Sequence, residues 1–541
     1  MKIVNFWNMS SKILSAAIVG LDAELVEVEA DISPGLSHFT IVGLPDMAVQ
    51  ESRERVRAAI KNSNLPFPRT RVTVNLAPAD LKKEGPSYDL PIAVAILLAS
   101  HFLKLPEKTA ETLGENLELL PGTKVVANLC YPEMLFVGEL ALDGVVRPVN
   151  GMLAIAAAAR ARGLKTLCVP EANAREASLI EGLEVIPINN LFQLVEHLAG
   201  KNLILPYTSE EPFDSGEDGL GDEENFDMAY VRGQEYAKRA LEIVAAGGHN
   251  ILMSGPPGSG KTLLSKTLPS ILPSLSIDEA LEVTRIYSVA GLLPPDEPLI
   301  IRRPFRSPHH TASNVSLVGG GTWPRPGEVS LSHRGVLFLD ELPEFNRAVL
   351  ESLRQPLEDG MVTISRAAGS LQFPAKFILV AARNPCPCGY NTDPEKFCTC
   401  SPSAILRYQK KISGPLLDRI DLHIEVPRVK FEKLAEEKVA ESSGEIKRRV
   451  MNARKLQRAR YKNFKIMTNA ELPSKMIKDF CQVDEVSQEF LKNAVNQMRL
   501  SARAYYRLLK IARTVADLSG EEKILLSHVA EALQYRAKAA E

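Results

Sequence analysis

Apolar and polar residues alternate with two different periods along residues 11–200, and this patterning predicts a mixed α/β domain. Strand-like stretches occur at Ile13–Leu21, Leu25–Ala30, Phe39–Val42, Arg71–Leu76 and Leu135–Leu140, and the alternation of period two is clear at Leu25–Ala30 and Arg71–Leu76. Helical spacing of apolar residues occurs at Val49–Asn62, Leu90–Ala99 and Met152–Arg162. Ile13–Leu21 could also form the apolar core of a secretory signal, but the acidic residues that alternate with apolar ones directly after it favour a strand.

The same alternation of strands and helices returns further along the chain, after an acidic interruption. That interruption contains glycine and cannot bury enough apolar area to order itself, so it is expected to be a flexible linker. The last part of the chain is almost wholly helical and rich in Lys and Arg. We therefore expect an α/β domain at 1–205, the linker at 206–228, a second α/β domain with long insertions at 229–427, and a helical domain at 428–541.

The composition is that of a folded protein and excludes a uniformly basic nucleic-acid coat. The 541 residues include 64 Lys plus Arg and 66 Asp plus Glu, a formal net charge of −2. Residues 202–231 carry nine acids and no Lys or Arg, so a basic surface remains possible elsewhere. No apolar run approaches the roughly 18 residues of a membrane span. Without a secretory signal, we expect a cytoplasmic protein that has no membrane partner and keeps its thiols reduced.

A phosphate-binding loop is the strongest chemical signal in the chain. An apolar strand leads into G-x-x-x-x-G-K-T and then into a helix. The loop consists of Gly255, Pro256, Pro257, Gly258, Ser259, Gly260, Lys261 and Thr262. Its backbone N–H groups can surround the phosphates of ATP, while Lys261 would reach the β- and γ-phosphates and Thr262 would ligate Mg²⁺. The alternative, an ordinary glycine-rich turn, does not explain the strand–loop–helix context.

Two later strands end in side chains that suit the same site. Val336–Leu339 is followed by Asp340, which would hold Mg²⁺, and by Glu341, which would orient and polarise the attacking water. Phe377–Ala382 leads to Asn384, whose amide could contact the γ-phosphate and hold that water. In isolation, the first pair could be an acidic turn and Asn384 a turn former.

Four of the seven cysteines are clustered in a pattern that suits a metal. They are Cys386, Cys388, Cys398 and Cys400, with the spacing C-x-C-x9-C-x-C. Four thiolates can surround Zn²⁺ tetrahedrally and close a loop that has little apolar material. Pairs separated by one residue are tighter than the usual C-x2-C, and free or redox-active thiols are the alternative. We expect a structural Zn²⁺ here.

Two basic stretches in the helical part favour a nucleic-acid partner. Residues 447–465 contain nine Lys or Arg and no acid, with Tyr461 and Phe464 interleaved, a composition that can neutralise phosphates and stack bases. Contacts with nucleic acid are predicted at Arg454, Lys455 and Arg458. One helical face also carries Arg499, Arg503, Arg507, Lys510 and Arg513. Taken alone, either stretch could be a solvated helix or a subunit interface.

Together these motifs resemble those of AAA+ ATPases of the magnesium-chelatase-like group, and in particular the bacterial ComM/YifB family. The resemblance covers nearly everything from residue 11 onward. It is carried by Gly255–Thr262, Val336–Glu341, Asn384–Gly389, Ser413–Leu422 and Ser501–Leu518. It implies an α/β fold with a AAA+ P-loop core at 229–427, a C-terminal helical lid at 428–541, and ATP with Mg²⁺ as cofactors.

The resemblance also implies roles for residues that the chemistry alone leaves undefined. Arg419 is similar to the arginine finger that enters the site of a neighbouring subunit, which implies a homo-oligomeric ring, in this family a hexamer. Arg503 resembles the second sensor arginine, and Gly233 belongs to a segment that resembles the one around the adenine. Considered alone, Arg419 beside its acidic neighbours would be interpreted as a surface ion pair.

Two insertions are expected within the AAA+ core. Residues 290–332 resemble the helix-2 insert of this group and include His309 and His310, for which a structural or polar-contact role is favoured over metal binding. Residues 361–376 are predicted to form a hairpin. In related rings such hairpins point into the central pore and grip the substrate, so Arg366 is a candidate nucleic-acid contact.

The first domain resembles that of Lon-type proteases. Residues 82–89 are similar to the serine-bearing segment, with Ser87 at the position of the nucleophile. A serine hydroxyl needs a nearby base to attack, and Leu153 stands where the family carries its lysine. We therefore expect a Lon-like fold without peptidase activity, although Lys82 or Lys83 could in principle supply the base.

The sequence thus favours a hexameric ATP-driven motor that acts on single-stranded or branched DNA. The family resemblance implies a helicase that promotes branch migration when transforming DNA is integrated by homologous recombination. A magnesium-chelatase-type remodeller of a protein partner is the main alternative, and an ATP-dependent protease is a third hypothesis that Leu153 disfavours.

Overall fold

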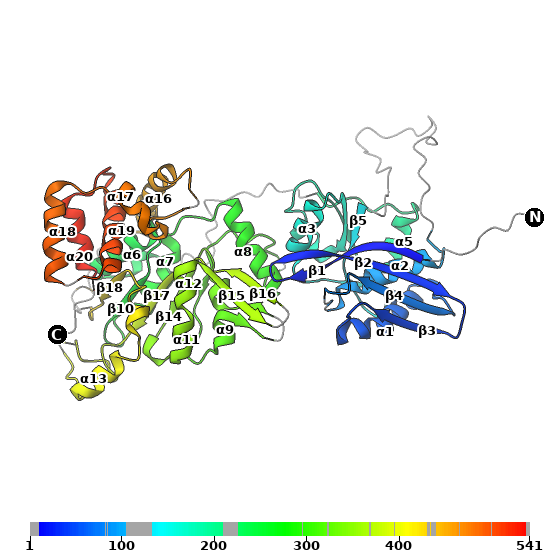
Figure 1. The fold of residues 1–541 in the computed structure, drawn as a ribbon, viewed down its shortest axis with the longest axis horizontal. Coiled ribbons are helices and arrows are strands. Elements are labelled where there is room, and N and C mark those ends of the chain that lie inside the picture. The colour runs from blue at the N-terminus through cyan, green and yellow to red at the C-terminus, as the bar shows by residue number, and fades with distance from the viewer. Residues whose placement is uncertain are drawn as a thin grey trace, which may run out of the picture. The chain divides into compact units, whose positions relative to one another are not determined.

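The computed structural model contains two compact units, which are described separately (Figure 1). Unit 1 comprises Met1–Asp214 and Thr284–Leu299, and unit 2 comprises Ser215–Val283 and Ile300–Glu541. The structure describes residues 10–81, 83, 85–103, 133–208, 226–294, 296–321, 324–366, 369–393, 395–429, 433, 440–464, 466–498 and 500–536. The predicted linker at 206–228 lies largely outside these residues. In the ranges just given, none of the helices has both the length and the apolar character of a membrane span.

Unit 1 is built on a seven-stranded sheet of order β3-β4-β2-β1-β5-β8-β9. Its strands are β1 (Ser10–Val19), β2 (Asp22–Ser33), β3 (His38–Val42), β4 (Arg71–Ala77), β5 (Met134–Phe136), β8 (Thr166–Pro170) and β9 (Glu184–Ile188), with a small hairpin of β6 (Glu139–Leu140) and β7 (Val146–Arg147). The pairs β1–β2 and β2–β4 are antiparallel, and the other pairs of the large sheet are parallel. Ile13–Leu21 is therefore mostly strand, as predicted.

Helices cover both faces of this sheet. They are α1 (Met47–Asn62), η1 (Pro86–Tyr88), α2 (Asp89–Ala99), α3 (Met152–Ala161), α4 (Glu171–Ala177) and α5 (Leu191–Leu198). Alternate residues of β1 belong to different cores, because Ala17 packs with α1 and α2 whereas Ala16 packs with α3 and α4. Both faces of β1 are therefore buried at its centre, which agrees with the nearly continuous apolar sequence there. Every residue of α2 is buried, which agrees with its nearly continuous apolar sequence.

The second half of α8 (Ile277–Ala290) belongs to unit 1, although the sequence assigns it to the second domain. The guanidinium of Arg285 donates to the Leu21 carbonyl and pairs with Asp22. The Ser288 hydroxyl donates to the buried Glu176 carboxylate, and its carbonyl accepts from Gly151 N–H at 3.1 Å. These polar contacts link residues distant in sequence, so periodicity alone does not reveal them.

Unit 2 contains a five-stranded, fully parallel sheet of order β11-β14-β17-β10-β18. Its strands are β10 (Ile251–Ser254), β11 (Phe305–Arg306), β14 (Val336–Leu339), β17 (Ile378–Arg383) and β18 (Leu422–Glu425). The central strands are continuous apolar runs because helices cover both faces of the sheet. Since the strands are parallel, the residues that follow β10, β14 and β17 meet at one edge.

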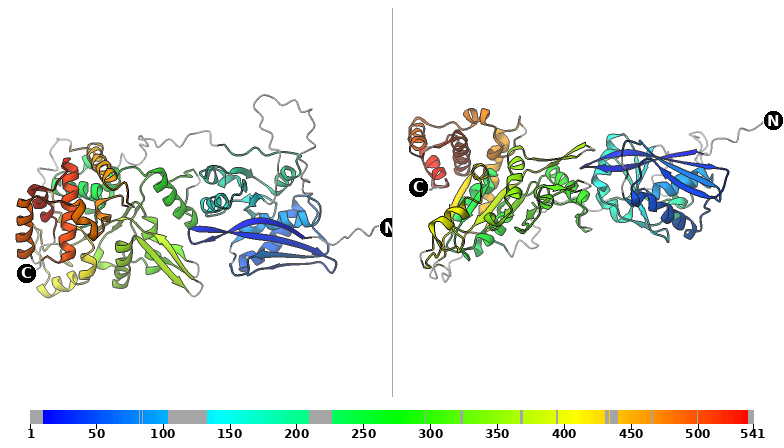
Figure 2. Two further views of the ribbon diagram at one scale, coloured as in Figure 1. Left: turned by 45° about the horizontal axis from the view of Figure 1, so that its top comes forward. Right: turned by 60° about the horizontal axis from the view of Figure 1, so that its bottom comes forward.

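The elements around this sheet include the predicted insertions. The helical ones are η4 (Met228–Tyr230), α6 (Glu235–Gly247), α7 (Lys261–Ile271), α9 (Asn314–Val318), α10 (Glu328–Leu331), η5 (Leu342–Glu344), α11 (Arg347–Ser352), α12 (Arg354–Asp359), α13 (Pro402–Gln409) and α14 (Gly414–Leu417). Two short strands pair with each other, β12 (Gly319–Gly320) and β13 (Arg325–Pro326). The hairpin predicted at 361–376 is present as β15 (Met361–Arg366) and β16 (Gly369–Pro374), a ribbon separate from the main sheet (Figure 2).

The C-terminal helices share one hydrophobic core with the parallel sheet. They are α16 (Ser443–Arg460), η6 (Asn469–Glu471), η7 (Ser474–Met476), α17 (Ile477–Phe480), α18 (Glu485–Gln497), α19 (Ala502–Ser519) and α20 (Leu526–Gln534). A capping box starts α16, in which the Ser442 hydroxyl accepts from Glu445 N–H and the Glu445 carboxylate accepts from Ser442 N–H. Helices α16 and α19 pack on α6 (Figure 1). Helix α16 also packs on α7, the helix that begins at Lys261.

Candidate nucleotide-binding site

The phosphate loop lies between the carboxyl end of β10 and the first turn of α7. Gly255 is required by close packing, because a Cβ atom there would lie 2.2 Å from the carbonyl oxygen of Val426. The loop is therefore held tightly against the segment that follows β18. This arrangement aims the free N–H groups of the helix N-terminus at the space where phosphates would bind.

Lys261 is almost buried at the centre of the loop, with 8% of its surface exposed. Its Nζ donates to the carbonyl oxygens of Gly255 (2.8 Å) and Pro256 (2.9 Å), and lies 3.4 Å from Asn384 Oδ1. Burial lowers the pKa of Lys261, and the charges of Asp340 and Glu341 oppose that change. The structure thus brings the predicted lysine, asparagine and acidic pair together at one edge of the sheet.

The residues present fit a magnesium ion. The Thr262 hydroxyl donates to Asp340 Oδ2 at 3.0 Å, which places two hard oxygen ligands side by side. Asp340 is fixed further because its Oδ1 accepts from Glu341 N–H at 2.9 Å. When bound, Mg²⁺ would neutralise charge on the phosphates of ATP.

Glu341, the carboxylate predicted to orient the attacking water, has an uncommon backbone conformation and a partner that the sequence did not identify. Its φ is +50°, in the left-handed region. His310 Nδ1 lies 3.5 Å from Glu341 Oε2, and the His310 ring packs edge-on against Phe345. This contact supports the polar role predicted for His310. His310 follows β11 and Glu341 follows β14, the neighbouring strand, and only this placement could have indicated that the two side chains meet.

A cavity of about 320 Å³ adjoins the start of the phosphate loop. It is lined by Gly233, Gln234, Glu235, Tyr236, Ser254, Gly255, Pro256, Thr392, Glu425, Val426 and Pro427. The side-chain amide of Gln234 donates to the Pro427 carbonyl at 2.7 Å and so links two segments that line the cavity. The segment around Gly233 therefore lies beside the phosphate loop, and its contact with adenine stays a prediction.

The four cysteines predicted to bind zinc converge in space. Their Sγ atoms all lie within 4.8 Å of one another, and they are the one potential metal-binding group of His, Cys, Asp or Glu found in the described ranges. Cys398 Sγ lies 3.7 Å from Cys386 Sγ and 3.6 Å from Cys388 Sγ. Tetrahedral zinc with Zn–S bonds of about 2.3 Å separates its sulfurs by about 3.8 Å, so the donor set fits Zn²⁺.

This cysteine loop also touches the phosphate loop. A Cβ atom on Gly389 would lie 2.6 Å from Pro257 Cδ, so the two loops approach at van der Waals distance. Thr392, between the two cysteine pairs, lines the cavity beside Gly255. The cysteine loop therefore helps to shape the nucleotide site.

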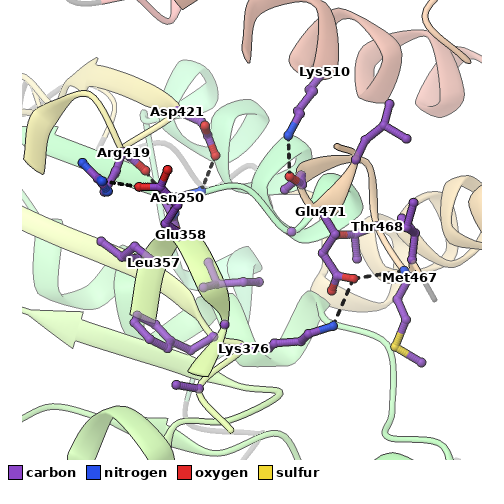
Figure 3. A pocket seen from close by; sticks show the side chains of 18 of the residues that line it. Asn250, Leu357, Glu358, Lys376, Arg419, Asp421, Met467, Thr468, Glu471 and Lys510 are labelled. Atoms are coloured by element: carbon purple, nitrogen blue, oxygen red, sulfur yellow. Dashed lines mark hydrogen bonds and ion pairs between the residues drawn. The ribbon is translucent and has the colours of Figure 1, made fainter. Parts of the chain in front are cut away.

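A larger pocket, of about 820 Å³, lies at the opposite edge of the parallel sheet. It is lined by residues that directly precede strands, namely Asn250, Gly335, Phe377 and Asp421. Figure 3 shows Arg419 directed at Glu358 on one side of it, with Lys376 and Glu471 on the other. Arg503 also pairs with Glu358, at 3.0 Å. The structure thus brings Arg419 and Arg503 together and separates both from the phosphate loop of the same chain by the length of β10.

This position does not support a contact between Arg503 and the nucleotide of its own chain, because Arg503 pairs with Glu358 at the far edge of the sheet. Two further residues of the basic face line the same pocket: Arg507 pairs with Asp421 at 3.3 Å, and Lys510 Nζ donates to the Ala470 carbonyl. Arg513 is buried and paired with Asp517. Within this basic face, Arg503, Arg507 and Lys510 therefore line the pocket and Arg513 lies in the core, whereas Arg499 lies outside the described residues.

The predicted nucleic-acid contacts on α16 have different environments. Lys455 and Arg458 are exposed. Arg454 turns inward, and its Nε and Nη2 donate to the Ala245 carbonyl. Burial lowers the pKa of Arg454 to about 9, with a further contribution from nearby Arg303. The placement of Arg454 therefore does not support a contact with nucleic acid.

Of the two aromatic residues predicted to stack with bases, only Phe464 is accessible. Tyr461 is 1% exposed, and its hydroxyl donates to Asn469 at 2.8 Å. Tyr461 is thus a core residue, which corrects the sequence-based expectation. Arg366 ends β15, and its side chain lies outside the described part of the structure.

Unit 1 does not assemble a Ser–Lys pair among its described residues. Lys83 is buried, and its Nζ donates to the Pro78 carbonyl rather than to Ser87. Leu153 is 2% exposed at the start of α3. The alternative base, Lys82, lies outside the described residues. Of the two lysines considered, Lys83 therefore has another partner, and the absence of a catalytic base stays a prediction.

A parallel sheet with a phosphate loop after one strand and an Asp–Glu pair after another defines a nucleotide-binding protein of the P-loop class. Three family models match most of the chain. "Magnesium chelatase, subunit ChlI" matches residues 227–434, "Subunit ChlI of Mg-chelatase" matches residues 28–120 and 117–173, and "Magnesium chelatase, subunit ChlI C-terminal" matches residues 440–536.

Individual relatives match over nearly the full length. The competence protein ComM of Haemophilus influenzae is 43% identical over 531 residues, which cover 97% of both chains. YifB of Escherichia coli is 43% identical over 522 residues, or 96% of both chains. Lon protease 1 of Hydrogenovibrio crunogenus is 25% identical over 193 residues, 34% of this chain and 21% of that protein. The chain therefore belongs to the ComM/YifB family of magnesium-chelatase-like AAA+ proteins.

Proposed function

We propose that this protein is an ATP-hydrolysing motor that assembles as a ring, in this family a hexamer, and moves along single-stranded or branched DNA. Its biological role would be to promote branch migration during integration of transforming DNA and homologous recombination. The match of 97% of the chain to the competence protein ComM supports a role in competence.

ATP hydrolysis is supported by the side chains gathered at the carboxyl edge of the sheet. Lys261 would exchange its two carbonyl partners for phosphate oxygens of ATP, and Thr262 with Asp340 would hold Mg²⁺. Glu341 would orient and polarise water toward the γ-phosphate, and Asn384, 3.4 Å from Lys261 Nζ, would contact that phosphate.

The observation that carries the ring is the position of Arg419. It follows α14 at the amino edge of the sheet, whereas the phosphate loop of its own chain follows β10 at the carboxyl edge. An arginine that stabilises the transition state from this position must act on the nucleotide of another copy. A single subunit would then lack one part of its site.

DNA as the substrate is supported by the exposed basic residues of α16 and by the β15–β16 hairpin. The direct test is the steady-state ATPase rate with and without single-stranded or forked DNA, with Glu341→Gln as the inactive control. A rate increase with either DNA is expected. An unchanged rate, together with no ATP-dependent DNA binding, would reject the DNA motor.

Removing two exposed charges is expected to weaken DNA binding in a salt-dependent manner. The double substitution Lys455→Ala, Arg458→Ala should reduce the slope of log K against log [salt] by about 1.4 for single-stranded DNA, because each lost phosphate contact contributes about 0.7. Fluorescence anisotropy across a salt series measures this slope. Lys475 and Lys478 are likewise exposed, so their double Ala variant is the matched control. Equal slopes for both variants would exclude α16 as a DNA-binding surface.

We also propose that the cysteine cluster holds a structural Zn²⁺. Substituting Cys398, whose Sγ lies within 3.7 Å of two of the other sulfurs, with Ser should reduce bound zinc from about one per chain to near zero, because three thiolates hold the metal poorly. ATP affinity should fall severalfold, since the loop of Gly389 packs on Pro257. Elemental analysis and nucleotide titration measure both effects, and buried Cys481→Ala is the control. Protein prepared without chelator that contains no zinc would refute the proposal.

The second candidate function is remodelling of a protein partner. The 38 kDa magnesium-chelatase subunit of Chlorobaculum tepidum is 21% identical over 337 residues, 57% of this chain and 78% of that protein. This alternative predicts an ATPase that DNA does not stimulate, so the same assay separates the two functions.

A further inference from the structure

Glu358 is bound by two arginines that come from separate parts of the chain. It lies in the last turn of α12, and its Oε2 accepts from Arg419 Nη2 while its Oε1 accepts from Arg503 Nη2 at 3.0 Å. Arg419 follows α14, and Arg503 lies in the first turn of α19. One carboxylate therefore holds both guanidinium groups at the pocket in Figure 3, which labels Glu358 and Arg419.

The hydrogen-bonding capacity of Arg419 is only partly used in this arrangement. Its Nη1 donates to the Pro415 carbonyl at 2.8 Å, and its side chain is 15% exposed. Its Nε is buried and has no hydrogen-bond partner among the described residues. A buried donor without a partner is costly, so an incoming anion with several oxygens would satisfy Arg419 better than Glu358 does.

The position of Glu358 in the chain connects this contact to the hairpin. Only Asp359 and Gly360 separate Glu358 from the first residue of β15. The base of the hairpin is closed by a hydrogen bond from Ala375 N–H to the Gly360 carbonyl at 2.8 Å. A displacement of the hairpin base would therefore move Glu358 relative to Arg419 and Arg503, which are attached to other elements.

We propose that Glu358 is a positioning residue that retains Arg419 and Arg503 until substrate reaches the β15–β16 hairpin. Substrate on the hairpin shifts Glu358 and releases both arginines to the γ-phosphate of ATP on the adjoining copy. Glu358 thus couples substrate engagement to hydrolysis. This inference rests on the proposed ring ATPase and specifies how its substrate regulates the site.

Glu358→Gln is expected to raise the ATPase rate without DNA about 2- to 5-fold, because loss of the carboxylate charge weakens an exposed ion pair that competes with hydrolysis. The KM for ATP should stay unchanged, and the ratio of DNA-stimulated to basal rate should fall. Asp359→Asn removes the neighbouring charge, which pairs with neither arginine, and should behave as wild type. Combining Glu358→Gln with Arg419→Ala should be as inactive as Arg419→Ala alone.

The outcome is measured on the full-length chain, with ring assembly followed by light scattering. An unchanged or lower basal rate for assembled Glu358→Gln would overturn this inference. If that variant does not fold, Glu358→Asp gives the same test, since its shorter side chain cannot reach both arginines, and it is judged by the same criterion. A wild-type protein without ATPase activity would instead reject the proposed function, so the two failures are distinguishable.

Discussion

Replacing Glu341 with Gln is expected to lower kcat for ATP hydrolysis by roughly 10²–10⁴-fold, the usual contribution of a positioned acid–base group. Glutamine has nearly the same shape but cannot polarise the attacking water as a carboxylate does. ATP binding should persist, because Lys261, Thr262 and Asp340 remain in place. Steady-state phosphate release measures the rate, and a fluorescent ATP analogue measures the affinity.

A neighbouring glutamate provides the control for this substitution. Glu344 lies in the same short turn, but its carboxylate pairs with Lys411 at 3.0 Å instead of facing the phosphate loop. Glu344→Gln should therefore retain the wild-type rate. If Glu341→Gln hydrolyses ATP as fast as Glu344→Gln does, Glu341 does not act on the water.

Arg419→Ala is expected to reduce the ATPase rate by roughly 10³-fold or more, the contribution of an arginine that stabilises transition-state charge. ATP affinity should change little, because Arg419 is proposed to stabilise charge that develops only in the transition state. The fold should survive, since Asn250 contacts the Arg419 carbonyl rather than its side chain. Steady-state rates and ATP titrations of the assembled protein test both expectations.

Arg407, which is exposed on α13, is the matched control for removal of one arginine. Arg407→Ala should hydrolyse ATP at the wild-type rate. If Arg419→Ala keeps a rate within a factor of about two of that control, the transition state of hydrolysis does not need Arg419. The proposed action of Arg419 on the ATP of another copy would then be wrong.

The phosphate site could be predicted because its chemistry is local in sequence. Eight contiguous residues define the loop, and the side chains of Asp340 and Asn384 each follow a strand whose apolar run is visible. Parallel strands bring such positions to one edge of a sheet. The contact of Lys261 with Asn384 and that of Thr262 with Asp340 follow directly from this rule.

The pairing of Glu358 could not be predicted, because its partners are 61 and 145 residues away and no local pattern links them. The contact of His310 with Glu341 depends likewise on adjacent strands rather than on spacing. The basic run on α16 was misleading for a related reason. Counting charges does not show which helix face is buried, so inward-facing Arg454 and buried Tyr461 were grouped with exposed Lys455.

The most direct test of a site shared between copies is the ATPase rate of a mixture of Glu341→Gln and Arg419→Ala subunits. Each variant alone should be nearly inactive. In mixed rings, intact Glu341 of one subunit meets intact Arg419 of another at about a quarter of the interfaces in an equal mixture. The account therefore predicts that mixing restores hydrolysis well above the sum of the separate samples. A mixture that assembles into mixed rings and remains as inactive as its components would contradict it.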